Sequence, residues 1–374
     1  MVDEKIVRLY KWYKYGRAPP YKIDIEPTAG CNLKCKFCWT REKSRLRACN
    51  YKKKLNGKTI FRIIEEAAEL GVREWQIAGG WEPLIRPKII MKMMKMIKEF
   101  GMYGCITTNG TLFTARMIKN MVEIGWDQIL FSVEGPDAAT HDYLVGKKGA
   151  FEKVKKNLLL FKYWKETYKT NKPKYSIHAV LCNVNYTKLS DMVLFGKKVG
   201  CEGVNFEPLI VWGEESEKIK LKEHHMKTLK KEIKRALKLA ERLNVPTNLK
   251  WWLNEALVEK KDMTEIMRKM KRGGGFLNSP CFYPWLGMEI RVSGRVTPCR
   301  LCDNEDPCDS VFEKNLEDIW YKGYLSDFRK DMIKWKLANF CSRCASGILV
   351  ETLKMKEKLI EFIKEKEKIG RSRI

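Results

Sequence analysis

The run AGCNLKCKFCW at residues 29–39 sets three cysteines, Cys31, Cys35 and Cys38, in a Cx3Cx2C arrangement. Thiolate sulfur is a soft ligand that suits iron–sulfur clusters, so three cysteines on one short loop can hold three corners of a cubic cluster. A [4Fe-4S] cluster has four irons, and the fourth iron would then be open to a small molecule. A structural zinc site is the alternative, but such sites normally close with four ligands, and no Cys or His follows near enough to complete one locally. We therefore expect an iron–sulfur centre with one open iron at this loop.

The residues around this loop predict an α/β fold. Residues 21–26 alternate between polar and apolar side chains, as a first strand does, and the cysteine loop follows them directly. The expected strands are 22–26, 74–78, 102–107, 128–133, 175–181 and 203–206, and the expected helices between them are 58–70, 87–100, 115–124, 151–167 and 189–199. Strand–helix alternation predicts βαβ units with a parallel sheet, and six units suit a partial barrel better than a closed eight-stranded one.

The motif and its setting after a first strand resemble the radical S-adenosylmethionine (radical SAM) superfamily. In that family the open iron binds the amino and carboxylate groups of SAM, and an electron from the reduced cluster cleaves SAM to a 5′-deoxyadenosyl radical that abstracts a hydrogen atom. The resemblance implies that Cys31, Cys35 and Cys38 hold the catalytic cluster and that Phe37 lies beside the adenine. It also implies a partial (βα)6 barrel core and a reducing donor of the ferredoxin or flavodoxin type.

The turn after the second expected strand reads Gly79-Gly80-Trp81-Glu82-Pro83. It resembles the GGEP motif of the same family, whose backbone lies along the SAM amino group, although Trp81 is an insertion in the usual order. The resemblance implies SAM contacts from Gly79 and Gly80, with Glu82 as a carboxylate opposite the SAM ammonium. A Gly pair followed by Pro is also an ordinary strand-to-helix turn.

The fourth expected strand ends in a stretch that resembles the S-x-D-G-P…H-D…G pattern of SPASM-linked members of the family. The resemblance implies that Ser132 bonds the ribose or carboxylate of SAM. Glu134 replaces the commoner Asp, and Val145 stands where these relatives often carry Arg, so Lys147 or Lys148 is expected to supply the missing cation. Asn183, after the fifth expected strand, is a weaker pocket candidate that could equally cap a loop.

A second group of cysteines lies near the end of the sequence. Its members, with one glycine between them, are Cys281, Gly294, Cys299, Cys302, Cys308, Cys341 and Cys344. Residues 288–292 and 295–298 predict a hairpin that turns at Ser293-Gly294, because tight hairpin turns need a residue with positive φ. Such a turn would bring Cys281 and Cys299 toward one site.

The spacing Cys281-x12-Gly294-x4-Cys299 resembles the opening of the SPASM and twitch modules attached to many radical SAM enzymes. A full SPASM module uses seven cysteines for two auxiliary clusters, whereas no Cys follows Cys344 here. The resemblance therefore favours one auxiliary [4Fe-4S] cluster, held by Cys281, Cys299, Cys341 and Cys344. Cys302 and Cys308 would then be surplus, as structural thiols, alternative ligands or a hydrogen donor. Two auxiliary clusters, the second incompletely ligated, or zinc are the alternatives.

Composition leaves the partner open. The 374 residues include 73 Lys and Arg against 46 Asp and Glu, a formal net charge of +27. A nucleic-acid partner is possible but not favoured, because much of the excess is Lys interleaved with Glu on expected helices such as 227–242. No secretory signal or membrane-length apolar run stands in the sequence, and 13 Cys fit metal or redox use in a reducing compartment, so we expect a cytoplasmic protein without a membrane partner.

The expected organisation is a basic and aromatic arm (1–20), a radical SAM core (21–215), a helical linker (216–278), a cysteine-rich module of small α+β type (279–345) and a terminal helix (346–374). The expected function is that of a radical SAM oxidoreductase or maturase. It would remove a hydrogen atom from a peptide or protein side chain, or from a small metabolite, while the auxiliary cluster aids electron transfer or substrate binding. The alternatives are a radical SAM enzyme that modifies RNA, or a non-catalytic iron–sulfur or zinc protein that binds RNA.

Overall fold

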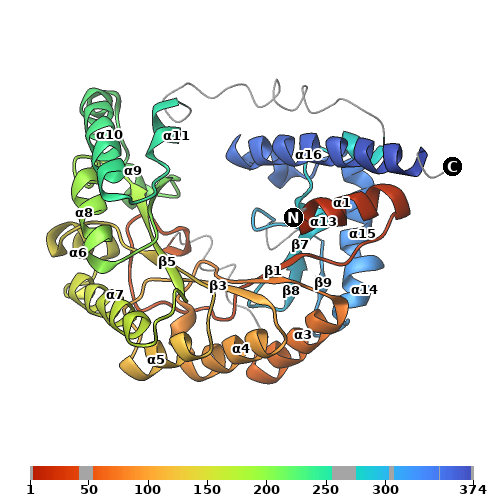
Figure 1. Ribbon diagram of the computed structural model, residues 1–374, viewed down its shortest axis with the longest axis horizontal. Helices are drawn as coiled ribbons and strands as arrows, with labels where there is room; N and C mark the ends of the chain where they lie inside the picture. The colour runs from red at the N-terminus through yellow and green to blue at the C-terminus, as the bar shows by residue number, and fades with distance from the viewer. Residues whose placement is uncertain (1–2, 42–53, 255–274, 303–306, 345, 372–374) are drawn as a thin grey trace. The chain divides into compact units, whose positions relative to one another are not determined.

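A computed structural model describes residues 3–41, 54–254, 275–302, 307–344 and 346–371 (Figure 1). Contacts divide the chain into two units. We call residues 26–52 and 76–259 the central unit, and residues 1–25, 53–75 and 260–374, which include both chain ends, the terminal unit. The three-cysteine motif falls in the central unit, and the later cysteines fall in the terminal unit.

The central unit is built on parallel strands in the order β6-β5-β4-β3. These strands are β3 (Tyr103–Thr108), β4 (Gln128–Ser132), β5 (Lys174–Leu181) and β6 (Val204–Pro208). The helices that follow the strands or lead into them are α4 (Pro87–Glu99), α5 (Ala115–Glu123), α6 (Ala138–Val145), α7 (Ala150–Thr167) and α8 (Leu189–Val199). Parallel neighbours need such crossover connections, because a tight turn can join only antiparallel strands.

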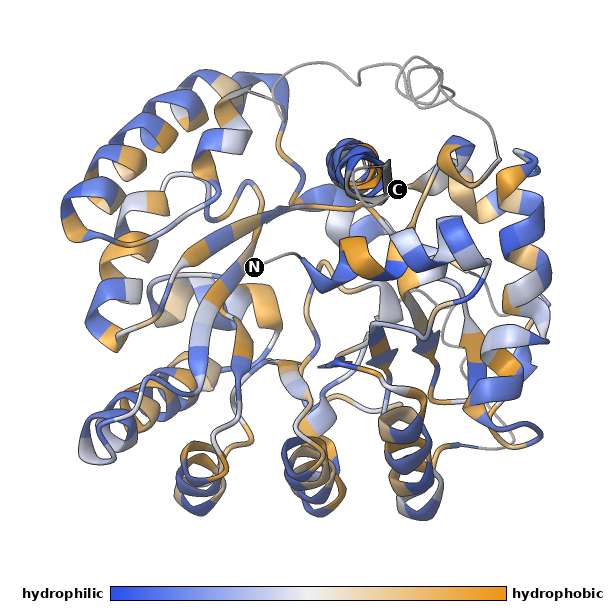
Figure 2. Cartoon of the chain, turned by 45° about the vertical axis from the view of Figure 1, so that its right-hand side comes forward, coloured by the Kyte–Doolittle hydropathy of each residue, from blue (hydrophilic) through white to orange (hydrophobic). Residues whose placement is uncertain are grey.

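Amphipathic helices cover this sheet, and Figure 2 shows hydrophobic and hydrophilic residues mixed along each of them. In α5, for example, Met117, Ile118, Met121 and Val122 are buried, and the Thr114 hydroxyl accepts a hydrogen bond from the Met117 N–H at 3.2 Å as the N-cap. Aromatic rings fill the space between helix and sheet: Phe131 on β4 lies 5.8 Å from Phe161 on α7, edge to face. The α/β core predicted from alternation is thus confirmed.

The terminal unit contains β1 (Lys22–Ile25), which pairs in parallel with β7 (Gly287–Ile290) near the other end of the chain. The strand β8 (Arg295–Thr297) pairs antiparallel with β7, and β9 (Asp309–Ser310) pairs antiparallel with β8. Gly294 makes the β7–β8 turn at φ +81°, and a Cβ there would lie 2.4 Å from the Phe312 ring. The predicted hairpin is confirmed, whereas its parallel addition to β1 was not foreseen.

The remaining elements of the terminal unit are mostly helical. They are α1 (Glu4–Tyr15), α3 (Gly57–Leu70), η3 (Gly275–Asn278), α13 (Tyr283–Leu286), α14 (Leu316–Tyr321), α15 (Tyr324–Ile333), η4 (Asn339–Arg343) and α16 (Ser346–Arg371). Helix α1, expected only as an arm, packs against α16, with the Tyr10 and Phe362 rings 5.3 Å apart. Both helices belong to one core: Ile6 and Leu9 share it with Leu359.

The remaining elements of the central unit are short, except one. They are η1 (Trp39–Arg41), η2 (Pro83–Ile85), α9 (Glu214–Lys218), α10 (Glu223–Leu243) and α11 (Leu249–Asn254), while β2 (Glu74–Ile77) straddles the boundary between the units. The long helix α10 ends at Leu243, and its C-cap residue Asn244 has a left-handed φ of 52°. In the described part of the chain, no helix combines the length and the apolar character needed to cross a membrane.

Candidate metal centres

The three-cysteine loop, residues 29–39, is here called the cluster loop. Cys31 is exposed, and Cys35 and Cys38 are half-buried. Burial raises the pKa of Cys35 well above 9, and Glu134, Cys38 and Cys31 raise it further. Because thiolates are the ligands for iron, the protons of these thiols must leave when metal binds. Cys31 and Cys38 thus lie near enough to Cys35 to affect its pKa, and the binding of a cluster by these three cysteines stays a prediction.

Helix α6 holds the cluster loop by its backbone. The Lys34 and Lys36 N–H groups donate to the carbonyls of Val145 and Leu144 at 3.0 and 2.9 Å. Gly146 follows at φ +66°, where a Cβ would lie 2.6 Å from the Lys34 carbonyl oxygen. The Val145 side chain packs with Leu33 in a small apolar cluster. Val145 therefore supports the loop, and this explains an apolar residue where Arg is common.

Lys147 and Lys148 follow that glycine. The Lys147 ammonium donates to the Asn32 carbonyl at 3.2 Å, so this cation lies on the cluster loop. The expectation that Lys147 or Lys148 replaces the missing Arg toward the SAM carboxylate stays a prediction.

Asn109, in the turn after β3, borders the cluster loop. Its side-chain nitrogen lies 3.9 Å from the Cys31 sulfur. The same nitrogen donates a hydrogen bond to the side-chain oxygen of Asn32 at 3.0 Å. The Asn32 amide in turn donates to the Thr111 hydroxyl at 2.8 Å. Amide donors beside ligand sulfurs tune cluster potential and orientation. An Asn-Gly pair also occurs in ordinary turns, so its residue type alone does not predict this contact.

Gly80 makes room for the cluster loop, and Gly79 makes room for Glu26 just before it. A Cβ on Gly80 would lie 2.2 Å from the Trp39 ring, and one on Gly79, which has φ +141°, would lie 2.7 Å from Glu26. The Gly80 carbonyl also lies 3.9 Å from the Cys38 sulfur. The glycines predicted to contact SAM are thus brought to the third cysteine of the motif.

Glu82 is a buried carboxylate that ties two turns together. One oxygen accepts hydrogen bonds from the Thr108 hydroxyl at 2.7 Å and the Leu84 N–H at 3.0 Å, and the other accepts from the Asn109 N–H at 2.7 Å. Its backbone N–H donates to the Gly30 carbonyl at 3.0 Å. Burial raises the pKa of Glu82, while these donors oppose the rise. Three bonds to protein leave this carboxylate little freedom, so it fixes the turn around Asn109.

The end of β4 carries Ser132 and Glu134. Ser132 is half-buried and pairs with His178 of β5 in the sheet register. The Glu134 carboxylate accepts from the Val180 N–H at 2.7 Å, and its own N–H donates to Nδ1 of His141 at 3.1 Å. Burial raises the pKa of Glu134 to about 8 and lowers that of His141 to about 4. Both groups are therefore mainly neutral at pH 7, next to the half-buried part of the cluster loop.

Phe37 and Asn183 lie on the side of the unit formed by β5 and β6. Phe37 packs against Leu144, Cys182 and Ile219 in an apolar cluster. The Asn183 side-chain amide donates a hydrogen bond to the Lys218 carbonyl at 3.0 Å, and this bond holds two loops together. Contacts of Phe37 and Asn183 with SAM stay predictions.

Four of the later cysteines converge in the terminal unit. Burial raises the pKa of Cys281 to about 12, and Cys344, Cys299 and Cys341 add to the rise. Burial likewise raises the pKa of Cys344 to about 11, with Cys299 as the next cause. Cys281, Cys299 and Cys341 also pack against the same apolar core of the terminal unit. We call Cys281, Cys299, Cys341 and Cys344 the auxiliary site.

The two surplus cysteines have other surroundings. Cys302 is buried in the core that includes Phe282 and Phe340. Burial raises the pKa of Cys308, and its charged neighbours are Arg295 and Asp309. Of the roles left open by the sequence, a structural thiol fits Cys302 best, and the role of Cys308 stays open.

A polar network around the buried Asp24, beside the auxiliary site, was not predicted from the sequence. Asp24, on β1, accepts hydrogen bonds from the Tyr283 hydroxyl at 2.6 Å and from the Arg300 guanidinium at 3.1 Å. The same side chain pairs with Lys22 at 3.1 Å. Tyr283 follows Cys281 by two residues, and Arg300 follows Cys299 directly. Residues separated by more than 250 positions meet here only because β7 pairs with β1, so no local pattern predicts the contact.

Both sites fit iron–sulfur clusters by their donor sets, which consist of three and four grouped thiols. Among the residues described, no three His, Cys, Asp or Glu side chains approach closely enough to bind one common metal ion. A cubic cluster does not require this, because each cysteine binds a different iron.

The comparisons with known families agree with these donor sets. Residues 25–167 match the family model of the radical SAM superfamily, and residues 281–345 match that of SPASM, an iron–sulfur cluster-binding domain. Residues 25–167 of the chain therefore form a radical SAM domain, and residues 281–345 form a SPASM domain. A radical SAM domain binds a [4Fe-4S] cluster with SAM, and a SPASM domain binds auxiliary iron–sulfur clusters.

Curated relatives match parts of the chain. The tungsten-containing aldehyde ferredoxin oxidoreductase cofactor-modifying protein of Pyrococcus furiosus is 28% identical over 48% of this chain and 49% of its own length. The AdoMet-dependent heme synthase of Methanosarcina barkeri is 33% identical over 36% of this chain and 37% of its own. The serine-type anaerobic sulfatase-maturating enzyme of Bacteroides thetaiotaomicron is 27% identical over 52% and 47%. The chain thus spans about half the length, or less, of these relatives.

Solved structures share the fold over most of the chain. Streptococcus suis SuiB bound to S-adenosylmethionine has a TM-score of 0.61 at 22% identity, covering 84% of this chain and 69% of SuiB. Native anSMEcpe with bound AdoMet has a TM-score of 0.59 at 16% identity, covering 95% of this chain and all of anSMEcpe.

Proposed function

We propose that this protein is a radical SAM enzyme that removes a hydrogen atom from a peptide or protein side chain. The observation that carries the proposal is the cluster loop: three grouped thiols on a rigidly supported loop, which leave one iron of a [4Fe-4S] cluster open. When bound, the reduced cluster and SAM together supply the one-electron chemistry. The chain's own residues supply binding, orientation and exclusion of water.

Each part of the cluster loop has a task in this proposal. Cys31, Cys35 and Cys38 hold the cluster, and the Asn109 amide orients and tunes the Cys31 sulfur. The Gly79–Gly80 backbone lies against the loop without side chains, which leaves its carbonyls accessible to the SAM amino group. Phe37 offers an apolar face for the adenine, and Ser132 offers a hydroxyl for the ribose or carboxylate.

The auxiliary site would hold one [4Fe-4S] cluster through its four thiols. In our proposal it takes an electron from the substrate after hydrogen removal, or it anchors the substrate. A ferredoxin- or flavodoxin-type protein would deliver the electron that starts the reaction.

We favour a peptide substrate over a small molecule because several similar proteins act on peptides or proteins. Similar proteins include PqqA peptide cyclases, at 30% identity over 35% of this chain, and the sulfatase-maturating enzyme. One similar structure is SuiB bound to its precursor peptide SuiA. Other relatives are named for a heme and for a cofactor, so a small metabolite is the second candidate.

Anaerobic reconstitution with iron and sulfide, reduction with dithionite and an assay for 5′-deoxyadenosine test the enzyme proposal. We expect 5′-deoxyadenosine from the wild type and none from a Cys31/Cys35/Cys38→Ala triple variant. Zinc as the sole metal together with no cleavage of SAM would overturn the proposal. The same triple variant should keep about four irons per chain if there is one auxiliary cluster, and about eight if there are two.

The substrate class needs a separate experiment. Peptides, metabolites and nucleosides are compared between cells with and without the gene. A mass change in a peptide supports the proposal, a change in a metabolite supports the second candidate, and a change confined to modified nucleosides favours the RNA alternative.

A further inference from the structure

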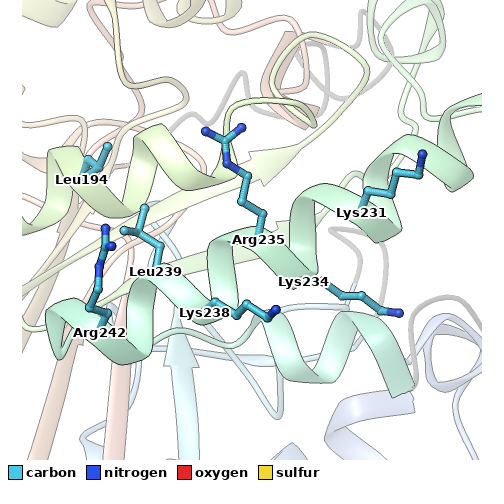
Figure 3. A pocket seen from close by; sticks show the side chains of 7 residues that line it. All are labelled: Leu194, Lys231, Lys234, Arg235, Lys238, Leu239 and Arg242. Carbon is cyan, nitrogen blue, oxygen red and sulfur yellow. The ribbon is translucent and has the colours of Figure 1, made fainter.

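The central unit has a groove between α8 and α10, with a volume of about 660 Å³ (Figure 3). It lies on helices that carry no residue of the cluster loop. Its lining side chains are Leu194, Lys231, Lys234, Arg235, Lys238, Leu239 and Arg242. The groove thus combines five cations with two leucines.

The cations form one row along α10. Lys231, Lys234 or Arg235, Lys238 and Arg242 follow one another at intervals of three or four residues, so they share a face of the helix. Like charges at this spacing repel and destabilise a helix. In the described part of the chain these five cations form a single ion pair, Arg235 with Glu232 at 3.9 Å. Glu232 also accepts a hydrogen bond from the Ser190 N–H at 2.9 Å, so it offers the row little compensation.

The leucines give the groove an apolar centre. The Leu194 side chain, on α8, is 47% exposed, and Leu239 is half-buried on the facing helix. Figure 3 shows Leu239 directed from α10 toward α8, with Arg235 and Arg242 to either side. An apolar side chain from a partner would cover these leucines, and carboxylates beside it would meet the cations.

The mixture of leucines and cations favours a peptide over a nucleic acid. Proteins that bind single strands stack bases on aromatic rings, whereas the two uncharged side chains in this lining are leucines. A phosphate backbone would pair with the cations but leave the leucines against water. An acidic peptide with leucine-like side chains satisfies both parts of the lining.

We propose that the α8–α10 groove binds an acidic, leucine-containing segment of the peptide substrate, away from the residue that is modified. This inference rests on the proposed function for the peptide nature of the substrate. Binding of such a remote segment raises the local concentration of the reacting side chain at the cluster loop. The groove would recognise this segment whatever the identity of the reacting side chain. The acidic segment would then select the substrate, and the cluster loop would act on whichever side chain it presents.

Equilibrium binding of a synthetic probe tests the proposal without SAM or reductant. The probe is a fluorescein-labelled peptide in which leucines alternate with pairs of glutamates. Its controls are the same peptide with glutamine for every glutamate, and a labelled oligouridylate. We expect the acidic probe to bind, its glutamine counterpart to bind at least ~10-fold more weakly, and added salt to weaken the acidic probe.

Two double variants locate the binding. Lys234→Glu/Lys238→Glu should weaken the acidic probe by ~10-fold or more, whereas Lys153→Glu/Lys156→Glu, with the same charge change at exposed positions on α7, should leave it within ~2-fold. Leu194→Gln should weaken it by ~3-fold through the apolar contact alone. Circular dichroism checks that each variant is folded. If the Lys234→Glu/Lys238→Glu variant does not fold, Lys234→Gln/Lys238→Gln is tested in its place.

Equal weakening by both double variants would overturn the proposal, because binding would then follow net charge. Groove-dependent binding of the oligouridylate without binding of the acidic peptide would also overturn it. Since the assay uses no SAM, absence of SAM cleavage would refute the proposed function and leave the binding result intact. Conversely, normal SAM cleavage with groove-independent peptide binding would refute this inference alone.

Discussion

The cluster loop and the auxiliary site solve the same problem, the grouping of thiols, in different ways. The cluster loop takes its three sulfurs from one short run of sequence, and its supports are α6, the Gly79–Gly80 turn and Asn109. The auxiliary site collects its sulfurs from three separate places in the chain: before α13, after β8, and at the end of η4. The first arrangement is local and needs precise support, whereas the second exists only when the terminal unit has folded. Loss of a ligand should therefore affect chemistry at the first and folding at the second.

The largest expected effect separates the two sites directly. Cys35→Ala should abolish 5′-deoxyadenosine formation and leave thermal stability close to wild type. Cys281→Ala should still form 5′-deoxyadenosine but lower the unfolding midpoint by roughly 5 °C or more, since a bound metal contributes folding free energy. Differential scanning fluorimetry measures the unfolding midpoint, and the SAM assay measures 5′-deoxyadenosine, on the same reconstituted samples. Loss of SAM cleavage in both variants would contradict the expected difference between the cluster loop and the auxiliary site.

The next effect tests the support of the cluster loop. Gly80→Ala would put a Cβ 2.2 Å from the Trp39 ring, so the loop must shift or fail to hold its cluster. We expect iron content to fall by about half while the auxiliary cluster remains. Gly30→Ala is the matched control, because its Cβ would lie at an ordinary 3.7 Å from Ile85. Full iron content in Gly80→Ala would show that the contact is not required.

A smaller effect is expected from the amide beside Cys31. Asn109→Ala removes an N–H that approaches the Cys31 sulfur at 3.9 Å, so the cluster should become harder to reduce and SAM cleavage should slow by ~10-fold. Redox titration followed by electron paramagnetic resonance measures the potential. Asn157→Ala, which removes a bond of 2.7 Å to the Gly110 carbonyl behind the same turn, should lower stability without changing the potential.

The last prediction concerns Glu134 and pH. Its pKa rises from 4.5 to about 8 through burial, so between these values the native state holds a proton that the unfolded state has released. Stability of the metal-free protein should therefore fall by up to ~1.4 kcal/mol per pH unit across that range and level off above it. Urea unfolding of wild type and Glu134→Gln at several pH values measures the slope. A slope that persists unchanged in Glu134→Gln would assign it to other groups.

Much of the fold was predictable because it follows from local periodicity. The strands and the helices between them have strong alternating or amphipathic patterns, and their observed bounds lie within a few residues of the expected ones. Helix α1 was missed because Arg8 interrupts its buried face: this side chain is 4% exposed and bonds to the Pro19 and Gly71 carbonyls. From sequence alone an Arg is expected at the surface, and its burial can be explained only once the carbonyl groups that bind it are known.

The thiols of both sites were also predictable, since cysteine spacing is visible in the sequence. Their surroundings were not. The roles of Glu82 as a brace for the Asn109 turn and of Asp24 as a partner for Arg300 depend on which strands lie side by side. Parallel pairing of β1 with β7 joins residues at opposite ends of the chain, and neither strand alone specifies its neighbour.

The shared core of α1 and α16 has a consequence for the order of events during synthesis. Ile6 and Leu9 pack with Leu359 in the core that borders Cys281, so that core stays incomplete until α16 has been synthesised. The cluster loop and its supports lie between residues 26 and 259 and emerge much earlier. We therefore expect the supports of the cluster loop to be complete earlier in synthesis than the core beside Cys281.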